Sequence, residues 1–258
     1  MHTYCFFLGF PRSSTTLMAA LLNAHPHIAI ALELHVFRQL SQYPTQESLF
    51  EALIDKVGQD QTQIMNKGYV VRGWFQADTS SALVIGDKKA GGTSFALSRK
   101  PHQLGQLREL LDPSIRFRVL CLVRNPYDTI ATIMNKAVQN DLSHNSLAAS
   151  IARYERILSG IEAGIGMLSE EELLCIHSEL ITLEPDRTLT QILEFLGVEI
   201  PDGYLDACKN VLFAEPRLTR HSVKWTPLQK LRINRLIAKH DLLQGYSFDN
   251  SSFPWEDG

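Results

Sequence analysis

Cysteine is scarce, and no pair of cysteines has the spacing of metal ligands. The chain holds four, at Cys5, Cys121, Cys175 and Cys208. Cysteines this far apart are typical of buried free thiols in a reducing compartment, so we expect a cytoplasmic protein. No run approaches the ~20 apolar residues of a membrane-spanning helix. The short apolar run near the start follows no charged segment, so neither a membrane span nor a secretory leader is expected.

An excess of positive charge is also missing. Lysine and arginine number 25 against 28 acidic residues, which gives a net charge of −3. This balance does not indicate a nucleic-acid-binding protein, although a local basic pocket is compatible with it. There is no internal repeat and no low-complexity tract. With 45% apolar and 21% charged residues, residues 1–258 are predicted to form one large α/β domain, with a tail from about 250 to 258.

One stretch near the start predicts a strand, a tight turn and a helix. Residues 4–8 are an apolar run typical of a strand buried on both faces. Gly9 and Pro11 break the pattern, and apolar residues then recur at helical spacing. A helix start offers free backbone N–H groups and the positive end of the helix dipole. Here it stands beside Arg12 and four hydroxyl side chains, Ser13, Ser14, Thr15 and Thr16. This composition indicates a site for phosphate or sulfate; a plain turn capped by serine is the alternative.

This turn differs from the nucleotide-binding loop of kinases and NTPases, G-x-x-x-x-G-K-[ST]. Gly9 matches the first glycine, but Ser14 and Thr15 stand where the second glycine and the lysine would be. The positive charge comes three residues earlier, from Arg12. The missing lysine disfavours a nucleotide kinase or NTPase, which stays as the alternative enzyme class.

The segment Gly9-Phe10-Pro11-Arg12-Ser13-Ser14-Thr15-Thr16-Leu17, with His25-Pro26 downstream, resembles the 5'-phosphosulfate loop of sulfotransferases that use 3'-phosphoadenosine 5'-phosphosulfate (PAPS). It is most similar to the Pro-Arg-Ser-Gly-Thr-Thr form of the bacterial and tyrosylprotein enzymes. The resemblance implies a single-domain fold with a central parallel sheet flanked by helices, similar to that of P-loop proteins. Ser14 replaces the usual glycine, so a positive φ there would be mildly strained.

An acidic residue follows the second predicted strand, residues 28–32. By position, Glu33 matches the general base of the tyrosylprotein-type enzymes, and the resemblance implies that role here. A helix cap or a surface acid is the alternative. His35, two residues on, is expected to line the acceptor pocket or to satisfy a backbone group.

Residues 47–57 are predicted to form an amphipathic helix and 58–67 a loop. The aromatic run that follows contains Trp74 and Phe75, which are candidates for the wall of a substrate pocket. Core packing is the favoured alternative for both, because aromatic side chains usually serve cores.

A further predicted strand begins at Leu83 and runs into Lys88 and Lys89. The segment resembles the Gly-Asp-Lys-Thr-Pro stretch of the same family, in which the lysine lies near the oxygen that bridges phosphate and sulfate. Lys88 takes that position. Lys89 replaces the threonine, so the two lysines could exchange roles, and a solvated lysine pair is the alternative.

A helix is predicted over 101–111, and the clearest strand spans 117–123. The strand is followed by Arg124, a proline and a helix. This resembles the family's 3'-phosphate motif: Arg124 matches, Asn125 replaces an aspartate, and Thr132 stands at the position of a serine. Two such turns on parallel strands would place two phosphate clamps at one edge of the sheet. A merely solvated arginine is the alternative.

The remaining sequence gives weaker signals. A loop is predicted over 137–145, helices over 147–168 and 226–240, and a strand over 173–177. At His177 the family has a tyrosine; this histidine could contact adenine, although a satisfied histidine at a strand end is favoured. The candidates for a basic loop that closes over the 3'-phosphate are Arg220, Ser222 and Lys224, and a solvated loop is equally consistent.

The resemblance thus implies a PAPS-dependent sulfotransferase acting on a hydroxyl group, or an amine, of a small-molecule acceptor such as a secondary metabolite. Glu33 would be the base, Lys88 would stabilise the leaving oxygen, and Arg12 would hold the phosphosulfate. The product nucleotide would be 3'-phosphoadenosine 5'-phosphate. No metal is expected, because no acidic or histidine cluster has ligand spacing. A catalytically silent nucleotide-binding protein of the same fold is the non-enzymatic alternative.

Overall fold

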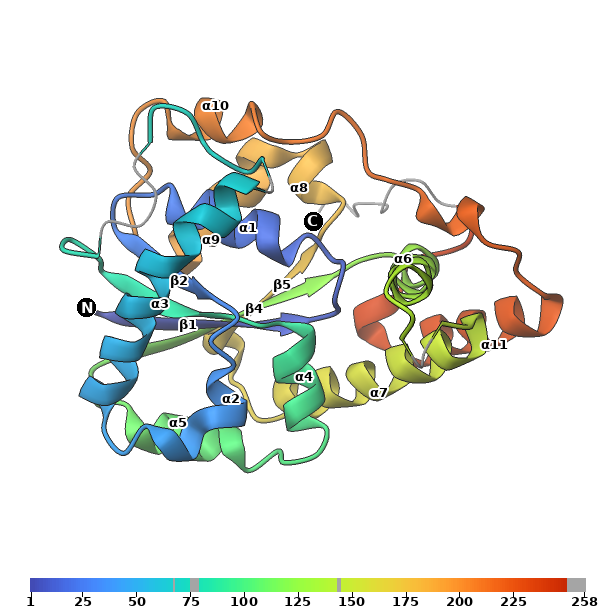
Figure 1. Cartoon of the computed structure of the whole chain (residues 1–258), viewed down its shortest axis with the longest axis horizontal. Helices are drawn as coiled ribbons and strands as arrows, with labels where there is room; N and C mark the ends of the chain where they lie inside the picture. Colours follow the sequence, from blue (N-terminus) through green and yellow to red (C-terminus); the bar gives the residue numbers. More distant parts are fainter. Residues whose placement is uncertain (67, 75–78, 143–144, 250–258) are drawn as a thin grey trace.

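The computed structural model describes residues 1–66, 68–74, 79–142 and 145–249. Phe75 and the expected tail at 250–258 lie outside these residues. Five parallel strands form one sheet in the order β2-β3-β1-β4-β5 (Figure 1). The strands are β1 (Thr3–Gly9), β2 (Ile28–Leu32), β3 (Val84–Lys88), β4 (Arg116–Val123) and β5 (Leu173–His177). The predicted α/β fold with a central parallel sheet is therefore confirmed.

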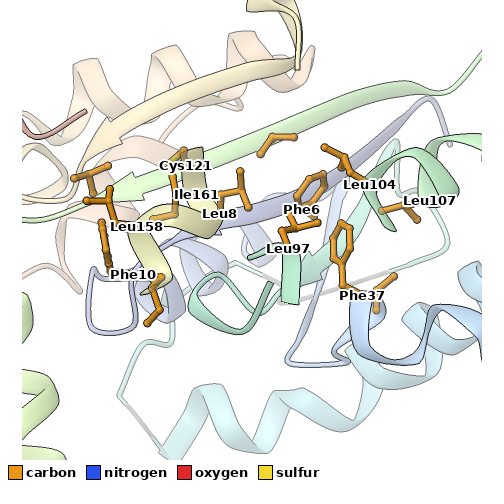
Figure 2. Close-up of a cluster of buried hydrophobic side chains, with 14 of the residues drawn as sticks. Phe6, Leu8, Phe10, Phe37, Leu97, Leu104, Leu107, Cys121, Leu158 and Ile161 are labelled. Atoms are coloured by element: carbon orange, nitrogen blue, oxygen red, sulfur yellow. The ribbon is translucent and has the colours of Figure 1, made fainter. Parts of the chain in front are cut away.

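Helices cover both faces of the sheet, which explains why β1 and β2 read as continuous apolar runs. One face carries α1 (Thr15–Asn23), α8 (Leu180–Leu183), α9 (Pro185–Leu196) and α10 (Tyr204–Lys209). The other carries α2 (Val36–Gln39), α4 (Gly91–Leu97), α5 (Gln103–Leu110) and α7 (Leu147–Ile165) (Figure 1). Figure 2 shows this second core, where Phe6 and Leu8 of β1 lie beside Leu97 of α4 and Ile161 of α7.

The strand ends are brought together at one edge because all five strands are parallel. Gly9 pairs with Leu122, and Leu32 with Lys88. Gly9 has φ 128°, and a Cβ atom there would lie 2.3 Å from the carbonyl oxygen of Leu122. Only glycine fits this approach, so the two turns that follow β1 and β4 start as immediate neighbours.

The predicted loop at 58–67 is wrong over most of its length, because α3 spans Gln46–Asn66. The polar residues of this stretch belong to the helix, whose buried side continues through Val57 and Ile64. Asp60 is buried as well. Its Oδ2 accepts a hydrogen bond from the backbone N–H of Leu32 at 2.5 Å, so this helix holds the end of β2.

Other bounds also differ from the sequence predictions. The helices α4 and α10 were not predicted, and α6 (Pro126–Gln139) extends into the predicted loop at 137–145. In α7, a Cβ atom at Gly160 would lie 1.7 Å from the backbone oxygen of Ser94, so glycine lets α7 pack directly on α4. Helix α11 spans Pro227–Lys239, close to its prediction.

All four cysteines are free, but Cys175 is exposed, so the expectation of buried thiols is wrong at that position. It lies on β5, at the edge of the sheet, which leaves its side chain open to solvent. In the part of the chain that the structure describes, no helix has both the length and the apolar character needed to cross a membrane.

Candidate active site

The turn between β1 and α1 is built as an anion-binding loop. Ser94 Oγ donates to the carbonyl oxygen of Gly9 and accepts from its N–H, each at 3.1 Å, which anchors the start of the turn. Ser14 precedes the helix with φ 55°, so the serine that stands at the family's glycine position lies in the left-handed region, where an L-residue is mildly strained. Ser13 Oγ is buried and has no hydrogen-bond partner among the described residues. The turn therefore places free N–H groups and an unsatisfied hydroxyl next to the exposed Arg12.

Lys88 joins this turn to the end of β2. Its ammonium donates to Thr16 Oγ1 at 3.1 Å and to Glu33 Oε1 at 3.2 Å. The Lys88 side chain is only 3% exposed, whereas that of Glu33 is 40% exposed. One buried cation thus lies between the first turn of α1 and a carboxylate that is open to solvent.

Lys89 contacts the same carboxylate from the other side. Its Nζ lies 2.6 Å from Glu33 Oε2. Burial by itself raises the pKa of Glu33, but the charge of Lys88 and the hydrogen bond and charge of Lys89 outweigh it and lower the pKa to about 2. Glu33 is therefore ionised, and both of its oxygens are occupied by lysines.

Asp87 fixes the backbone that carries Glu33 and His35, and the sequence reasoning gave it no role. Its two carboxylate oxygens accept hydrogen bonds from the N–H groups of Leu34 at 2.9 Å and Val36 at 3.2 Å. Burial raises the pKa of Asp87 to about 6, even though these two donors lower it. Its position before Lys88, at the end of a predicted strand, was the available signal.

Residues from the turns after β1, β2 and β3 border one cavity of about 960 Å³, although Ser13 and Ser14 are not among them. The predicted residues Arg12, Thr15 and Thr16 line it, together with Glu33, His35 and Lys88. Trp74 does not line it: the indole ring packs edge-on against Tyr204 at 5.3 Å, on the α1 side of the sheet. The structure therefore places Trp74 in packing rather than at this cavity. Phe75, the other predicted wall residue, lies outside the described residues.

Backbone strain is concentrated around this cavity. Among the described residues, the non-glycine positions with positive φ are Arg12, Ser14, Glu33, His35, Ala90 and Asp141. All but Asp141 lie in the turns that follow β1, β2 and β3. Such conformations cost of order 1–3 kcal/mol each and cluster at functional sites. The strain is independent support for a site at these strand ends.

The second arginine-bearing turn lies against the first. Arg124 Nη1 donates to the carbonyl oxygen of Arg12 at 3.0 Å, and Nη2 donates to the carbonyl oxygen of Arg217. Thr132 Oγ1 lies 2.9 Å from Thr219 Oγ1 and donates to the carbonyl oxygen of Asp128 at 2.7 Å. The structure thus places Arg124 against Arg12, and Thr132 against Thr219, at the start of the predicted basic loop. Neither Arg124 nor Thr132 lines the cavity.

The side chain of His177 belongs to a hydrogen-bond network with Tyr246 and Glu179. Its Nδ1 lies 2.9 Å from the hydroxyl of Tyr246, which donates to Glu179 Oε2 at 2.9 Å. The other oxygen of Glu179 accepts the N–H of Asn125 at 2.9 Å, just before α6. Burial lowers the pKa of His177 to about 4. This geometry matches the favoured alternative, a satisfied histidine at a strand end.

The three candidates in the basic loop have different surroundings. The guanidinium of Arg220 is buried against Asp128, with Nη2 2.6 Å from Oδ2. Ser222 is exposed, and its Oγ donates to the carbonyl oxygen of Thr219 at 2.7 Å. Lys224 is exposed and makes no side-chain hydrogen bond or ion pair with the described residues. Arg220 is thus part of the packing, and only Ser222 and Lys224 face solvent.

Within the described ranges, no three histidine, cysteine or acidic side chains form a group that could hold a metal ion.

The sequence and the fold both resemble those of known proteins. A sequence model of the Sulfotransferase family matches residues 5–202. The fold is similar to the sulfotransferase domain of the Synechococcus PCC 7002 olefin synthase, with a TM-score of 0.55, 21% identity and coverage of 92% of this chain and 94% of that one. It is similar to mouse sulfotransferase SULT7A1 complexed with PAP, with a TM-score of 0.54, 14% identity and coverage of 93% and 84%. It is also similar to a sulfotransferase from Alicyclobacillus acidocaldarius, with a TM-score of 0.53, 16% identity and coverage of 93% of this chain and 92% of that one.

Proposed function

The chain belongs to the sulfotransferase family, and from this premise we propose that it transfers a sulfuryl group from PAPS to a hydroxyl group, or an amine, of a small-molecule acceptor. One observation carries the proposal. The buried Lys88 touches both Thr16 of the anion-binding turn and the cavity-lining carboxylate of Glu33. A cation in that position lies between the place for a donor phosphate and the place for an acceptor.

The residues at the turn fit a phosphosulfate. The unsatisfied Ser13 Oγ and the free N–H groups at the start of α1 are donors for an anion. Arg12 is exposed beside them and has the two-pronged donor geometry that suits phosphate oxygens. Ser13, Ser14, Thr15 and Thr16 with Arg12 would hold the 5'-phosphosulfate. Arg124 and Thr132 would hold the 3'-phosphate.

PAPS supplies an activated sulfuryl group whose departure leaves negative charge on a phosphate oxygen. Lys88 balances that charge, and its hydrogen bond to Thr16 supports assigning this role to Lys88 rather than Lys89. Glu33 accepts the proton of the acceptor while the new bond from sulfur to the acceptor oxygen or nitrogen forms and the bond from sulfur to the phosphate oxygen breaks. Glu33 becomes a stronger base when Lys88 turns from the carboxylate to the phosphate oxygen, because one of the two charges that lower its pKa then leaves.

We further propose a cytoplasmic location, which the four free cysteines support. A nucleotide kinase gains no support from the site, because Thr15 stands where a phosphate-binding lysine would be.

The first test is nucleotide binding followed by turnover. 3'-Phosphoadenosine 5'-phosphate (PAP) should stabilise the protein against heat far more than ATP does, and calorimetry should give the same order. With PAPS and a screen of hydroxyl and amine acceptors, Glu33→Gln should lower kcat by about 10²-fold or more, while the affinity for PAP stays within about twofold. The exposed Glu51→Gln on α3 is the matched control. Absence of PAP binding, or absence of turnover with every acceptor, would refute the proposed activity. Unchanged turnover in Glu33→Gln would remove only Glu33 from the role of base.

A further inference from the structure

The charge around the cavity is the reverse of the charge of the chain. Over the whole chain, acidic residues outnumber lysine and arginine by 28 to 25. Around the cavity, seven lysine and arginine side chains face a single carboxylate, Glu33. A local excess of one sign in a concave site raises the concentration of ligands of the opposite sign.

The proposed donor accounts for only part of this charge. Arg12, Lys88 and Lys89 lie at the strand ends, at the anion-binding turn and at Glu33. Four more cations line the cavity from the helices beyond it: Arg38 of α2, Arg99 and Lys100 just after α4, and Arg153 of α7. The four are exposed, so they are available to a ligand in the cavity.

These four side chains are not neutralised by the protein. None of them forms an ion pair with a described residue. Elsewhere, exposed basic side chains on other helices do find carboxylates: Arg232 pairs with Glu155, and Lys209 pairs with Asp186 at 2.9 Å. The absence of acidic neighbours is thus a property of this wall of the cavity.

We propose that the acceptor is an anionic hydroxyl or amine compound, whose carboxylate, sulfate or phosphate group is held by Arg38 and Lys100 while its nucleophile lies at Glu33. This inference rests on the proposed function and names the substrate class of that same site. Arg99 and Arg153 add to the positive field at the cavity wall.

The shape of the site supports an acceptor with an apolar body between its two polar ends. The apolar side chains of Phe37 and Phe95 line the cavity together with the cations. A second hollow of about 410 Å³ adjoins it and is also lined by Arg38, Lys100 and Gln103. Because Arg38 and Lys100 stand where the two hollows meet, an anion held there leaves room for the acceptor to extend beyond them.

The test compares acceptors that differ only in charge. Hydroxyphenylacetate, hydroxybenzenesulfonate and hydroxyphenylacetamide form an aromatic set, and hydroxyhexanoate and its amide form an aliphatic pair. Each is assayed with PAPS on the wild type, on Arg38→Gln/Lys100→Gln and on Arg156→Gln. Arg156 is the matched control, because it lies on α7 over Phe95 at 5.8 Å but does not line the cavity. The carboxylate and sulfonate members distinguish which anion is preferred.

We expect the anionic members to exceed the amides in kcat/KM by about tenfold or more, as loss of one charged hydrogen bond predicts. The double variant should lose this preference, and Arg156→Gln should keep it. Amides that are used equally well or better would overturn the inference, and so would a preference that survives in the double variant.

Thermal stabilisation by the same compounds gives a readout that does not need turnover. The acids should stabilise the wild type more than the amides do, and this difference should disappear in Arg38→Gln/Lys100→Gln. Equal stabilisation by acid and amide would overturn the inference. Failure of the protein to bind PAP would refute the proposed function, whereas PAP binding without any acid preference would refute only the anionic acceptor.

Discussion

Nζ of Lys89 lies 2.6 Å from Oε2 of Glu33, on the side of the carboxylate opposite Lys88. The two lysines overcome the effect of burial and lower the pKa of Glu33 to about 2. A base works in its deprotonated form, so a lowered pKa extends the active range towards acid. In the wild type, protonation of Glu33 should therefore cause no loss of kcat/KM for PAPS, which reports the free enzyme, above about pH 4.

Lys89→Met removes one of the two cations and should raise the pKa of Glu33 towards its ordinary value of 4.5. The acid limb of kcat/KM for PAPS should then move to higher pH, which a pH profile between about pH 3 and 8 would detect. Lys239→Met, at the exposed end of α11, is the control. Superimposable profiles for Lys89→Met and the wild type would contradict this account of Glu33.

Arg124 is predicted to select the 3'-phosphate. Arg124→Ala should weaken binding of PAP by about 1.5–3 kcal/mol, the range for a hydrogen bond to a charged group, and should leave adenosine 5'-phosphate nearly unaffected. Calorimetry with both nucleotides measures the difference. The exposed Arg187→Ala on α9 should change neither affinity. Equal weakening of the two nucleotides would remove Arg124 from the 3'-phosphate site.

The sequence was most informative where a buried strand runs into polar residues. All five strands were predicted near their observed bounds. The prediction was simplest for β1 and β2, which are buried along their whole length and read as unbroken apolar runs. In β3 the apolar start gives way to Asp87 and Lys88, and in β5 the apolar run is only partly buried. Parallel strands end at one edge, so Arg12, Glu33 and Lys88 could be expected to lie together. The cavity they border is consistent with that expectation.

The sequence was least informative about charged side chains that are buried, because a charged residue is normally predicted to be exposed. Asp60 and Asp87 are buried acids that hold backbone N–H groups, a role that depends on tertiary approach. Arg220 lay in a run that reads as a solvated basic loop, yet it is buried. The positive φ of Arg12 and His35 also carried no signal, since strain is imposed by packing rather than by local preference.

Ser14 offers a test of the strain in the anion-binding turn. At φ 55° it occupies the left-handed region, which costs an L-residue roughly 1–2 kcal/mol. Ser14→Gly relieves that cost but adds flexibility to the unfolded chain, worth about 0.5–1 kcal/mol. The free energy of unfolding in urea should therefore stay the same or rise by up to ~1.5 kcal/mol. The β-branched Ser14→Val should lower it, and a loss of more than about 1 kcal/mol in Ser14→Gly would show that the hydroxyl outweighs the strain.

The last prediction concerns the ion pair between Asp128 of α6 and Arg220, which joins this helix to the segment before α11. Nε of Arg220 lies 3.1 and 3.2 Å from the two carboxylate oxygens, and its backbone N–H donates to Oδ1 at 2.7 Å. Nη1 donates to the carbonyl oxygens of Ser247 and Phe248, each at 2.9 Å. Both charged side chains are only 2% exposed. The pair therefore ties three segments together away from water.

Removing one partner of such a pair should be far more costly than removing both. Asp128→Asn leaves a buried guanidinium without its counter-charge, and should lower the free energy of unfolding by about 3–5 kcal/mol. Asp128→Leu/Arg220→Met replaces both charges with apolar groups of similar size and should lose less. Urea unfolding of the two variants beside the wild type measures both losses. The exposed ion pair between Lys209 and Asp186 offers a control, because Lys209→Met should change the free energy of unfolding by less than about 1 kcal/mol. If the double variant were as unstable as Asp128→Asn, the loss would come from packing and backbone hydrogen bonds rather than from an unpaired charge.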